Sequence, residues 1–200
     1  LLHDVDIWER GAPSGTLNTP SSGTNVWKTG LSTNLNNVGY DYRSALYTPA
    51  FDLSDTEKDY TLKFNFSAES AACSSPTGIY MEYSLDDGLN WQTLGSSRRS
   101  AGDMNWYNRG DNLSCSMDFD ISEDKMGWTA ASGAGDFNLP VATKLNHLSG
   151  NANVAFRFVT TVLGNFNGGY GDDGFMIDDF EISATGPQAT FEATPTTALA

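Results

Sequence analysis

The stretch YTLKFNF, residues 60–66, alternates between large apolar and polar side chains. In an extended chain, the apolar residues from Tyr60 to Phe66 lie on one face and the polar residues between them on the other. This period of two predicts a β-strand with one buried face, and residues 153–159 repeat it. Similar short runs predict further strands near residues 5–9, 26–29, 44–48, 79–84, 91–94, 141–145 and 174–182.

The sequence lacks a helical pattern, because no long segment repeats apolar residues at positions i, i+3, i+4 and i+7. About nine or ten short strands joined by irregular loops predict an all-β fold, a two-sheet antiparallel β-sandwich. The 200 residues, 39% of them hydrophobic, suffice for one core. Two long loops, at 95–136 and 164–171, interrupt the strands, which favours a functional role or pinning by a cross-link or ion.

The chain is acidic, with 25 Asp and Glu against 11 Lys and Arg and a net charge of −14. We expect no nucleic-acid partner, because nucleic acids are bound through a basic footprint. No apolar run approaches the roughly 18 residues of a membrane span, so we expect no membrane insertion. Abundant Asp and Asn with few lysines suit a secreted or cell-surface protein that holds calcium through oxygen ligands. The absence of an initiator Met and a signal peptide predicts a fragment of a longer precursor.

The two cysteines, Cys73 and Cys115, lie in Ser-rich loop contexts. An even pair in loops predicts a disulfide formed in an oxidising compartment, and two free thiols are the alternative. A catalytic thiol would need a partner histidine, which the context does not provide.

The stretch YSLDDGLNWQTL, residues 83–94, contains the spacing S-x-D-x-G-x-x-W in Ser84, Asp86, Gly88 and Trp91. It resembles the Asp box that is repeated around sialidase propellers, but it occurs once here, between two predicted strands. Aspartates can accept backbone N–H bonds in a turn, glycine allows positive φ, and Trp91 can fold back as an apolar plug. We therefore predict a structural turn rather than a substrate contact.

Several short motifs, in their order along residues 4–183, resemble a MAM-like or cleaved-adhesin-like module of secreted bacterial multidomain proteins of the Bacteroidetes type. The matching stretches are WERGAPSG (8–15), SGTNVWKTGL (22–31), SALYTPAFDLS (44–54), LKFNF (62–66), YSLDDGLNWQTLG (83–95), NWY (105–107), GW (127–128), VAFRFV (154–159) and GDDGFMIDDFEI (171–182). The resemblance implies a jelly-roll sandwich, often with a structural calcium ion, that acts as an accessory adhesion or binding unit. Vertebrate MAM domains carry four cysteines, so their disulfide pattern is not carried over.

The predicted module covers residues 1–183. After Ser183 the composition shifts to Ala, Thr and Pro, which predicts a linker within residues 184–200. TFEATPTTA, residues 190–198, resembles the opening strand of an immunoglobulin-like module of the polycystic-kidney-disease-repeat type. We therefore expect the start of a second domain there, and the neighbouring domains of the same chain are possible partners.

The segment GDDGFMIDDFEIS, residues 171–183, is the most acidic predicted strand. On a regular strand Met176, Asp178, Phe180 and Ile182 share one face. If that face looks into the sandwich, an ionised Asp178 is costly there unless it is paired or binds a metal ion.

The resemblance implies that an acid of the first strand meets an acid of the last, which here would be Glu9 with Asp178 or Asp179. The loop SSGTN, residues 21–25, would add oxygens from Thr24 and Asn25. We therefore predict a structural calcium ion, a cation that prefers six to eight oxygen ligands. The alternative is that the acids are solvated charges or pair with arginines. The predicted metal ligands are Glu9, Asn25, Asp178 and Asp179, and the arginines are Arg10, Arg43 and Arg157.

Other acids and the histidines are assigned simpler roles. Asp172 and Asp173 are either further metal ligands or turn residues. Asp4 and Asp6 are either further metal ligands or ordinary charged residues. Zinc is not expected, because neither His3 nor His147 has a second His or a Cys at ligand spacing.

No catalytic constellation is evident. Nucleophilic triads need a histidine beside a Ser or Cys, and two isolated histidines do not indicate one. A glycosidase needs two carboxylates across a cleft, whereas the acids of this chain cluster with turn residues. We expect this chain not to be an enzyme.

Aromatic residues in the long loops are candidate platforms for sugars. They are Trp106, Tyr107, Trp128, Phe166 and Tyr170. Loop aromatics also commonly anchor a loop to the core, and that alternative stays open. Trp8 and Trp27 are predicted to be core residues.

Three functions follow from these observations. The first is a non-catalytic, calcium-stabilised adhesion or interaction module of a secreted or cell-surface multidomain protein. The second is a carbohydrate-binding accessory module of a glycan-degrading enzyme, and the third is an accessory domain of a secreted peptidase. The expected partners are a glycan or a surface protein.

Overall fold

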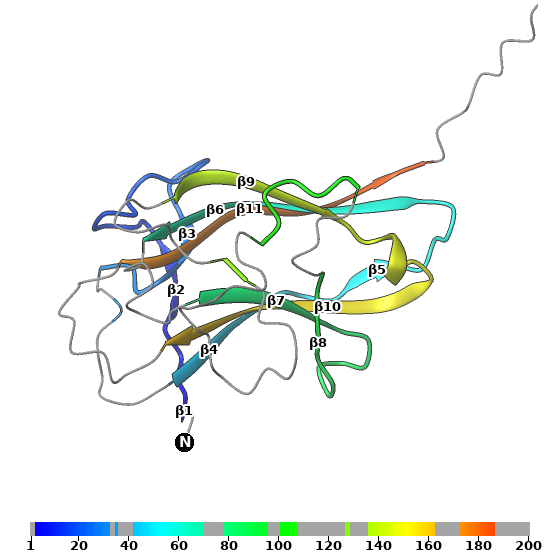
Figure 1. Cartoon of the computed structure of the whole chain (residues 1–200), viewed down its shortest axis with the longest axis horizontal. Coiled ribbons are helices and arrows are strands. Elements are labelled where there is room, and N and C mark those ends of the chain that lie inside the picture. Colours follow the sequence, from blue (N-terminus) through cyan, green and yellow to red (C-terminus); the bar gives the residue numbers. More distant parts are fainter. Residues whose placement is uncertain are drawn as a thin grey trace, which may run out of the picture.

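A computed structural model of the chain describes residues 3–32, 35, 42–69, 78–95, 101–107, 127–128, 136–162 and 173–186. Its strands form two packed layers (Figure 1). We call one layer the β4–β10 sheet; its strands, in spatial order, are β1 (His3–Asp4), β4 (Tyr42–Tyr47), β10 (Asn151–Val162), β7 (Gly78–Ser84) and β8 (Gln92–Thr93), and β5 (Phe51–Leu53) also pairs with β10. We call the other the β6–β11 sheet; its order is β2 (Trp8–Gly11), β3 (Val26–Thr29), β11 (Gly174–Thr185), β6 (Asp59–Glu69) and β9 (Asp136–Lys144).

The two-sheet sandwich predicted from the alternation is confirmed, and the jelly-roll connection order stays a prediction. Eleven strands are present in the described ranges, with one 3₁₀ turn, η1 (Asn146–Leu148). The strands pair antiparallel, apart from β1, which pairs parallel with β4. Each predicted strand has a counterpart, whereas β1 and β5 were not expected, because two or three residues are too few to show a period of two.

Alternation in β6 places its large apolar residues in the core. Tyr60, Leu62, Phe64 and Phe66 are all buried, as predicted. Phe64 packs edge-on against Phe158 of β10, with ring centroids 5.0 Å apart, so this contact joins the two sheets.

The two N-terminal tryptophans have different environments. Trp8 is 7% exposed and belongs to the core, as predicted. The core prediction for Trp27 is wrong, because 39% of this residue is exposed. It lies on the four-residue strand β3 beside the edge strand β2, where the sandwich does not enclose the ring.

A β-bulge in β11 changes which residues face the core. The register with β6 shifts between Asp178 and Glu181, and Asp179 has a φ of 51°. Before the bulge Phe175 and Ile177 lie in the main core, whereas after it Phe180 packs against that core. The prediction that Met176, Asp178, Phe180 and Ile182 share one face is therefore wrong. The bulge inserts one residue into β11, and Asp178 is not directed into the main core.

A buried ion pair fixes the loop that precedes β3. The Nζ of Lys28 lies 2.7 Å from Asp173 Oδ1, and the exposed fractions of the two side chains are 0% and 3%. The Lys28 ammonium also donates to the carbonyl of Ser14 at 2.6 Å, and Asp173 Oδ2 accepts the N–H of Leu17 at 2.5 Å. The pair thereby holds the segment from Ser14 to Leu17 over the outer face of the β6–β11 sheet, where Leu17 packs in a second small core with Val26 and Met176.

The last strand passes the predicted domain boundary. Ala184 and Thr185 belong to β11 and pair with Tyr60 and Asp59, so the boundary at residue 183 is two residues too early. The rest of the predicted linker, from residue 187 on, lies outside the described residues. Within the described ranges no helix is long and apolar enough to cross a membrane.

Candidate ligand-binding site

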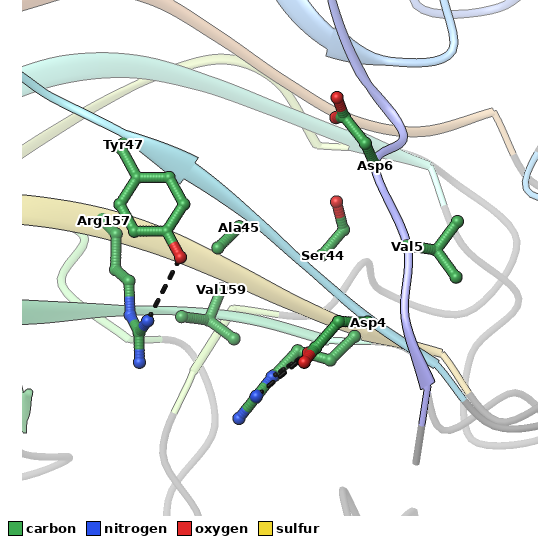
Figure 2. Close-up of a pocket in the computed structure, with 9 residues that line it drawn as sticks. Asp4, Val5, Asp6, Ser44, Ala45, Tyr47, Arg157 and Val159 are labelled. Carbon is green, nitrogen blue, oxygen red and sulfur yellow. Dashed lines mark hydrogen bonds and ion pairs between the residues drawn. The ribbon is translucent and has the colours of Figure 1, made fainter.

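A pocket of about 430 Å³ lies on the outer face of the β4–β10 sheet. The N-terminal segment that contains β1 borders it on one side, and Figure 2 shows Tyr47 and Arg157 at the opposite end from Asp4. Its volume falls within the range of about 300–1,000 Å³ that is typical of small-molecule sites. The lining residues are Asp4, Val5, Asp6, Arg43, Ser44, Ala45, Tyr47, Arg157 and Val159.

Two lining residues, Ala45 and the fully buried Val159, are apolar, and the rim of the pocket carries an aromatic ring. Ala45 and Val159 are directly opposite each other on β4 and β10. One row further along, Tyr47 is paired with Arg157, and Tyr47 is 59% exposed. An exposed ring beside apolar residues is a surface on which the C–H face of a ligand can stack.

Two guanidinium–carboxylate pairs stand at the ends of the pocket. Arg43 contacts Asp4 at 3.0 Å, and the two side chains are 39% and 78% exposed. Arg157 contacts Glu82 at 2.5 Å, and these side chains are only 15% and 14% exposed. The residues Arg43 and Tyr47 are four positions apart on β4, which corresponds to roughly 13 Å along a strand.

The Asp-box-like stretch forms a hydrogen-bonded turn between β7 and β8, so the structural-turn prediction is confirmed. Ser84 Oγ accepts the N–H of Gly88 at 2.9 Å, and Asp86 Oδ1 accepts the N–H of Asn90 at 2.9 Å. The groups that donate to its carboxylate hold the pKa of Asp86 below its usual value; the side-chain amide of Asn90 is the largest contributor, followed by the backbone N–H of Asn90. Asp87 and Gly88 have φ angles of 59° and 83°, as a tight turn requires.

The acids of β11 that were predicted to bind calcium are occupied by hydrogen-bond donors. Asp178 Oδ2 accepts the N–H groups of Ser21 at 2.8 Å and Ser22 at 3.1 Å, and Oδ1 accepts the N–H of Asp179 at 2.9 Å. Asp179 accepts the hydroxyl of Ser22 and the side-chain amide of Asn65, the latter at 3.1 Å. A cation needs lone pairs that are not directed at hydrogens. This arrangement therefore serves to fasten the loop before β3 onto β11.

Glu9, the predicted partner of these acids, lies elsewhere on the sheet. Its Oε2 accepts the N–H of Leu31 at 2.6 Å. In the strand register it is level with Lys28 and Met176, two residues before Asp178 and two strands away from it. The structure does not bring Glu9 and Asp178 together as predicted.

The remaining predicted ligands add no further oxygen cluster. Asn25 is exposed in the loop before β3, and Asp173 forms the ion pair with Lys28. Asp172 lies outside the described residues. The described part of the chain contains no group of three or more His, Cys, Asp or Glu residues that could hold a metal ion. In this arrangement Asp178 and Asp179 use part of their lone pairs for donors of the chain itself, and calcium binding stays a prediction.

The loop aromatics predicted to stack on sugars are in the core. Trp106 and Trp128 are 0% exposed and Tyr107 is 3% exposed, so a surface platform built from them is wrong. Their rings pack on one another, and the Tyr107 hydroxyl donates to the carbonyl of Leu94 at 2.7 Å. Burial raises the pKa of Tyr107 far above its usual value. The alternative prediction, that these residues anchor the long loop, describes them correctly.

Other predicted positions are outside the described residues or do not form a site. Phe166, Tyr170, Cys73 and Cys115 belong to segments that the structure does not describe. His147 lies edge-on to the ring of Tyr83, and desolvation of its imidazole lowers its pKa.

The pocket was not predicted from the sequence. Its most exposed ring, Tyr47, lies within a motif that was used only for the resemblance, and Arg157 was considered only as a partner for the β11 acids. The available signal was a single arginine in the apolar run VAFRFV, at an outward position of the strand. Which residues lie beside it depends on strand pairing, and no local pattern contains that information.

No protein-family model matches this chain, and a search of curated proteins returns no match. The likeness to MAM-like modules therefore rests on the ordered motifs of the sequence.

Proposed function

We propose that this chain is a non-catalytic adhesion or accessory module of a secreted or cell-surface protein, and that it binds a carbohydrate in the pocket on the β4–β10 sheet. The observation that carries the proposal is one pocket of about 430 Å³ that is lined by an exposed tyrosine, by apolar residues and by two arginines, each of them paired with a carboxylate. Sugar rings present C–H faces to aromatic rings and hydroxyl groups to charged side chains, so the pocket offers a partner for each.

The charges of the pocket favour a neutral sugar over an acidic one. The two arginines of the lining are balanced by the two aspartates of the N-terminal segment, and Arg157 has Glu82 as a further counter-charge. The whole chain carries a net charge of −14, which repels anionic polymers. A neutral, hydroxyl-rich ligand requires neither arginine to leave its carboxylate partner.

The position of the carboxylates supports binding rather than hydrolysis. Asp4 and Asp6 both come from the N-terminal segment and border the pocket on the same side, while Tyr47 and Arg157 form its opposite end (Figure 2). Glycoside hydrolysis requires two carboxylates that flank the scissile bond. Asp4 is also engaged by Arg43.

The test is a screen of the protein on a glycan array, followed by calorimetry with the best neutral oligosaccharide. We expect Tyr47→Ala to weaken binding about tenfold, which corresponds to roughly 1.4 kcal/mol and is of the size of an aromatic packing contact. Leu89→Ala is the matched control, because Leu89 is 82% exposed and does not line the pocket. No binding to any glycan, or equal affinity of wild type and Tyr47→Ala, would contradict the proposal.

A further inference from the structure

The hairpin between β7 and β8 is a rigid element next to the pocket. Ser84 Oγ lies 2.8 Å from Asp86 Oδ1 and also accepts the N–H groups of Asp86 and Gly88. The carboxylate of Asp86 accepts both the backbone N–H and the side-chain amide of Asn90, the latter at 2.6 Å. The conformation of this turn is therefore fixed within the hairpin and does not depend on a ligand.

The turn fixes the ring of Trp91. Its Nε1–H donates to the carbonyl of Gly88 at 2.9 Å. The ring lies so close to Gly88 that a Cβ on this glycine would be 3.3 Å from the ring carbon Cζ2. The tryptophan of the Asp-box spacing is thus bound to its own turn, with one face of the indole available to a neighbour.

That neighbour is Arg157, a lining residue of the pocket. Its Cζ lies 4.2 Å from the centroid of the Trp91 ring, which is a cation–π contact. Glu82 Oε2 accepts both Nε and Nη2 of the same guanidinium at 2.5 Å. Nη1 lies 3.4 Å from the Tyr47 hydroxyl, in the contact drawn in Figure 2.

The second arginine of the pocket provides an internal contrast. Arg43 is 39% exposed, and its partner Asp4 is 78% exposed. Arg157 is 15% exposed and is contacted by Trp91, Glu82 and Tyr47. Of its five N–H donors, two are used by Glu82 and one faces Tyr47, so donors remain for a ligand. A guanidinium held in one orientation loses little conformational freedom on binding.

From this geometry we propose that Trp91 is a positioning residue of the binding site, and that it presents the Arg157 guanidinium to acceptor oxygens of the ligand. The inference rests on the proposed carbohydrate-binding function and assigns a role to the Asp-box-like turn. Trp91 does not line the pocket, so it acts through the two lining residues it contacts: the Arg157 guanidinium, and the Tyr47 ring, whose centroid lies 5.7 Å from that of Trp91 in an edge-on arrangement. The sugar hydroxyls at the Tyr47 end are thereby distinguished from those at the more exposed Arg43 end.

The experiment is a substitution series at position 91 with Tyr, Phe and Leu. The strength of a cation–π contact depends on the quadrupole of the ring, with Trp the best ring, whereas leucine has none. We expect the affinity for the best neutral glycan to fall in the order Trp, Tyr, Phe, Leu, with Trp91→Leu about three- to tenfold weaker than wild type. Thermal unfolding of each variant verifies that the comparison is made on folded protein.

A readout without ligand separates the inference from the proposed function. In nitrogen-15 NMR spectra, the Nε–H signal of Arg157 should be distinct and protected in wild type and in Trp91→Phe, and averaged with solvent-exposed arginines in Trp91→Leu. Equal affinity and an equally ordered Arg157 in Trp91→Leu, while Tyr47→Ala still weakens binding, would overturn the positioning role alone. Absence of glycan binding by wild type, together with an Arg157 signal that depends on Trp91, would overturn the carbohydrate function instead.

Discussion

The buried ion pair between Lys28 and Asp173 allows a quantitative test of how the N-terminal loop is held. Lys28→Met retains the length of the side chain and removes its charge. Asp173 then still accepts the hydrogen bond from the N–H of Leu17, at 2.5 Å, but it loses its counter-charge. Its side chain is only 3% exposed, so water does not replace that charge. Removing one partner of a buried pair costs about 3–5 kcal/mol. A domain has about 5–15 kcal/mol of stability in total, so the loss is a large fraction of it.

The measurement is urea unfolding followed by tryptophan fluorescence, in which a lower midpoint with an unchanged slope reports lost stability. For a domain of this length the loss corresponds to a decrease in melting temperature of roughly 6–20 °C. Adding Asp173→Asn to Lys28→Met should recover about half of the loss or more, because the buried charge is gone while the amide oxygen still accepts from Leu17.

Lys58→Met is the matched control. Lys58 pairs with Asp55 at 3.1 Å, but the two side chains are 47% and 44% exposed, so its loss should leave the unfolding midpoint nearly unchanged. The reasoning is refuted if Lys28→Met costs less than about 1 kcal/mol, or if the double variant is no more stable than the single one.

Two further predictions concern pH and calcium. Burial raises the pKa of Tyr80 to about 12 and raises that of Tyr107 further, so the stability due to their neutral forms is complete below about pH 10 and is lost as the pH rises through the folded pKa values. For Tyr80 alone this is about 3 kcal/mol, and tyrosinate absorbance should rise together with unfolding, whereas ionisation of all tyrosines in a folded protein would contradict the assignment. If calcium is bound as the sequence predicts, a chelator lowers the melting temperature and added calcium restores it, because Asp178 and Asp179 then exchange N–H and O–H donors for the cation; an unchanged melting temperature would refute the site.

The sequence predicted well wherever the physical cause lies within a few residues. The alternation of β6 predicted its buried face correctly, because a strand needs only a period of two to separate core from solvent. The Asp-box-like turn was predicted for a similar reason, since Ser84, Asp86 and Asn90 satisfy one another within the hairpin.

The sequence predicted poorly where a feature depends on the end of a sheet or on a bulge. Trp27 has the apolar character of a core residue, but its exposure follows from its position beside an edge strand. A regular alternation was assumed through Asp178 and Phe180, and the bulge at Asp179 reverses it. For Trp106 and Trp128 the sequence allowed both a buried and an exposed ring, because the residues around a tryptophan in a loop show no period that separates the two environments; both rings are buried.

The sequence by itself determined the local strand pattern and the hairpin turn, from which the all-β class followed. The tertiary structure alone decided the binding surface. Arg157 meets Tyr47 across 110 positions of the chain and Glu82 across 75, and Arg43 meets Asp4 across 39. These contacts depend on the register of β1, β4, β10 and β7, and register is a property of paired strands. A pattern within one strand can therefore predict which face is outward, but it does not contain the residues that will stand next to it.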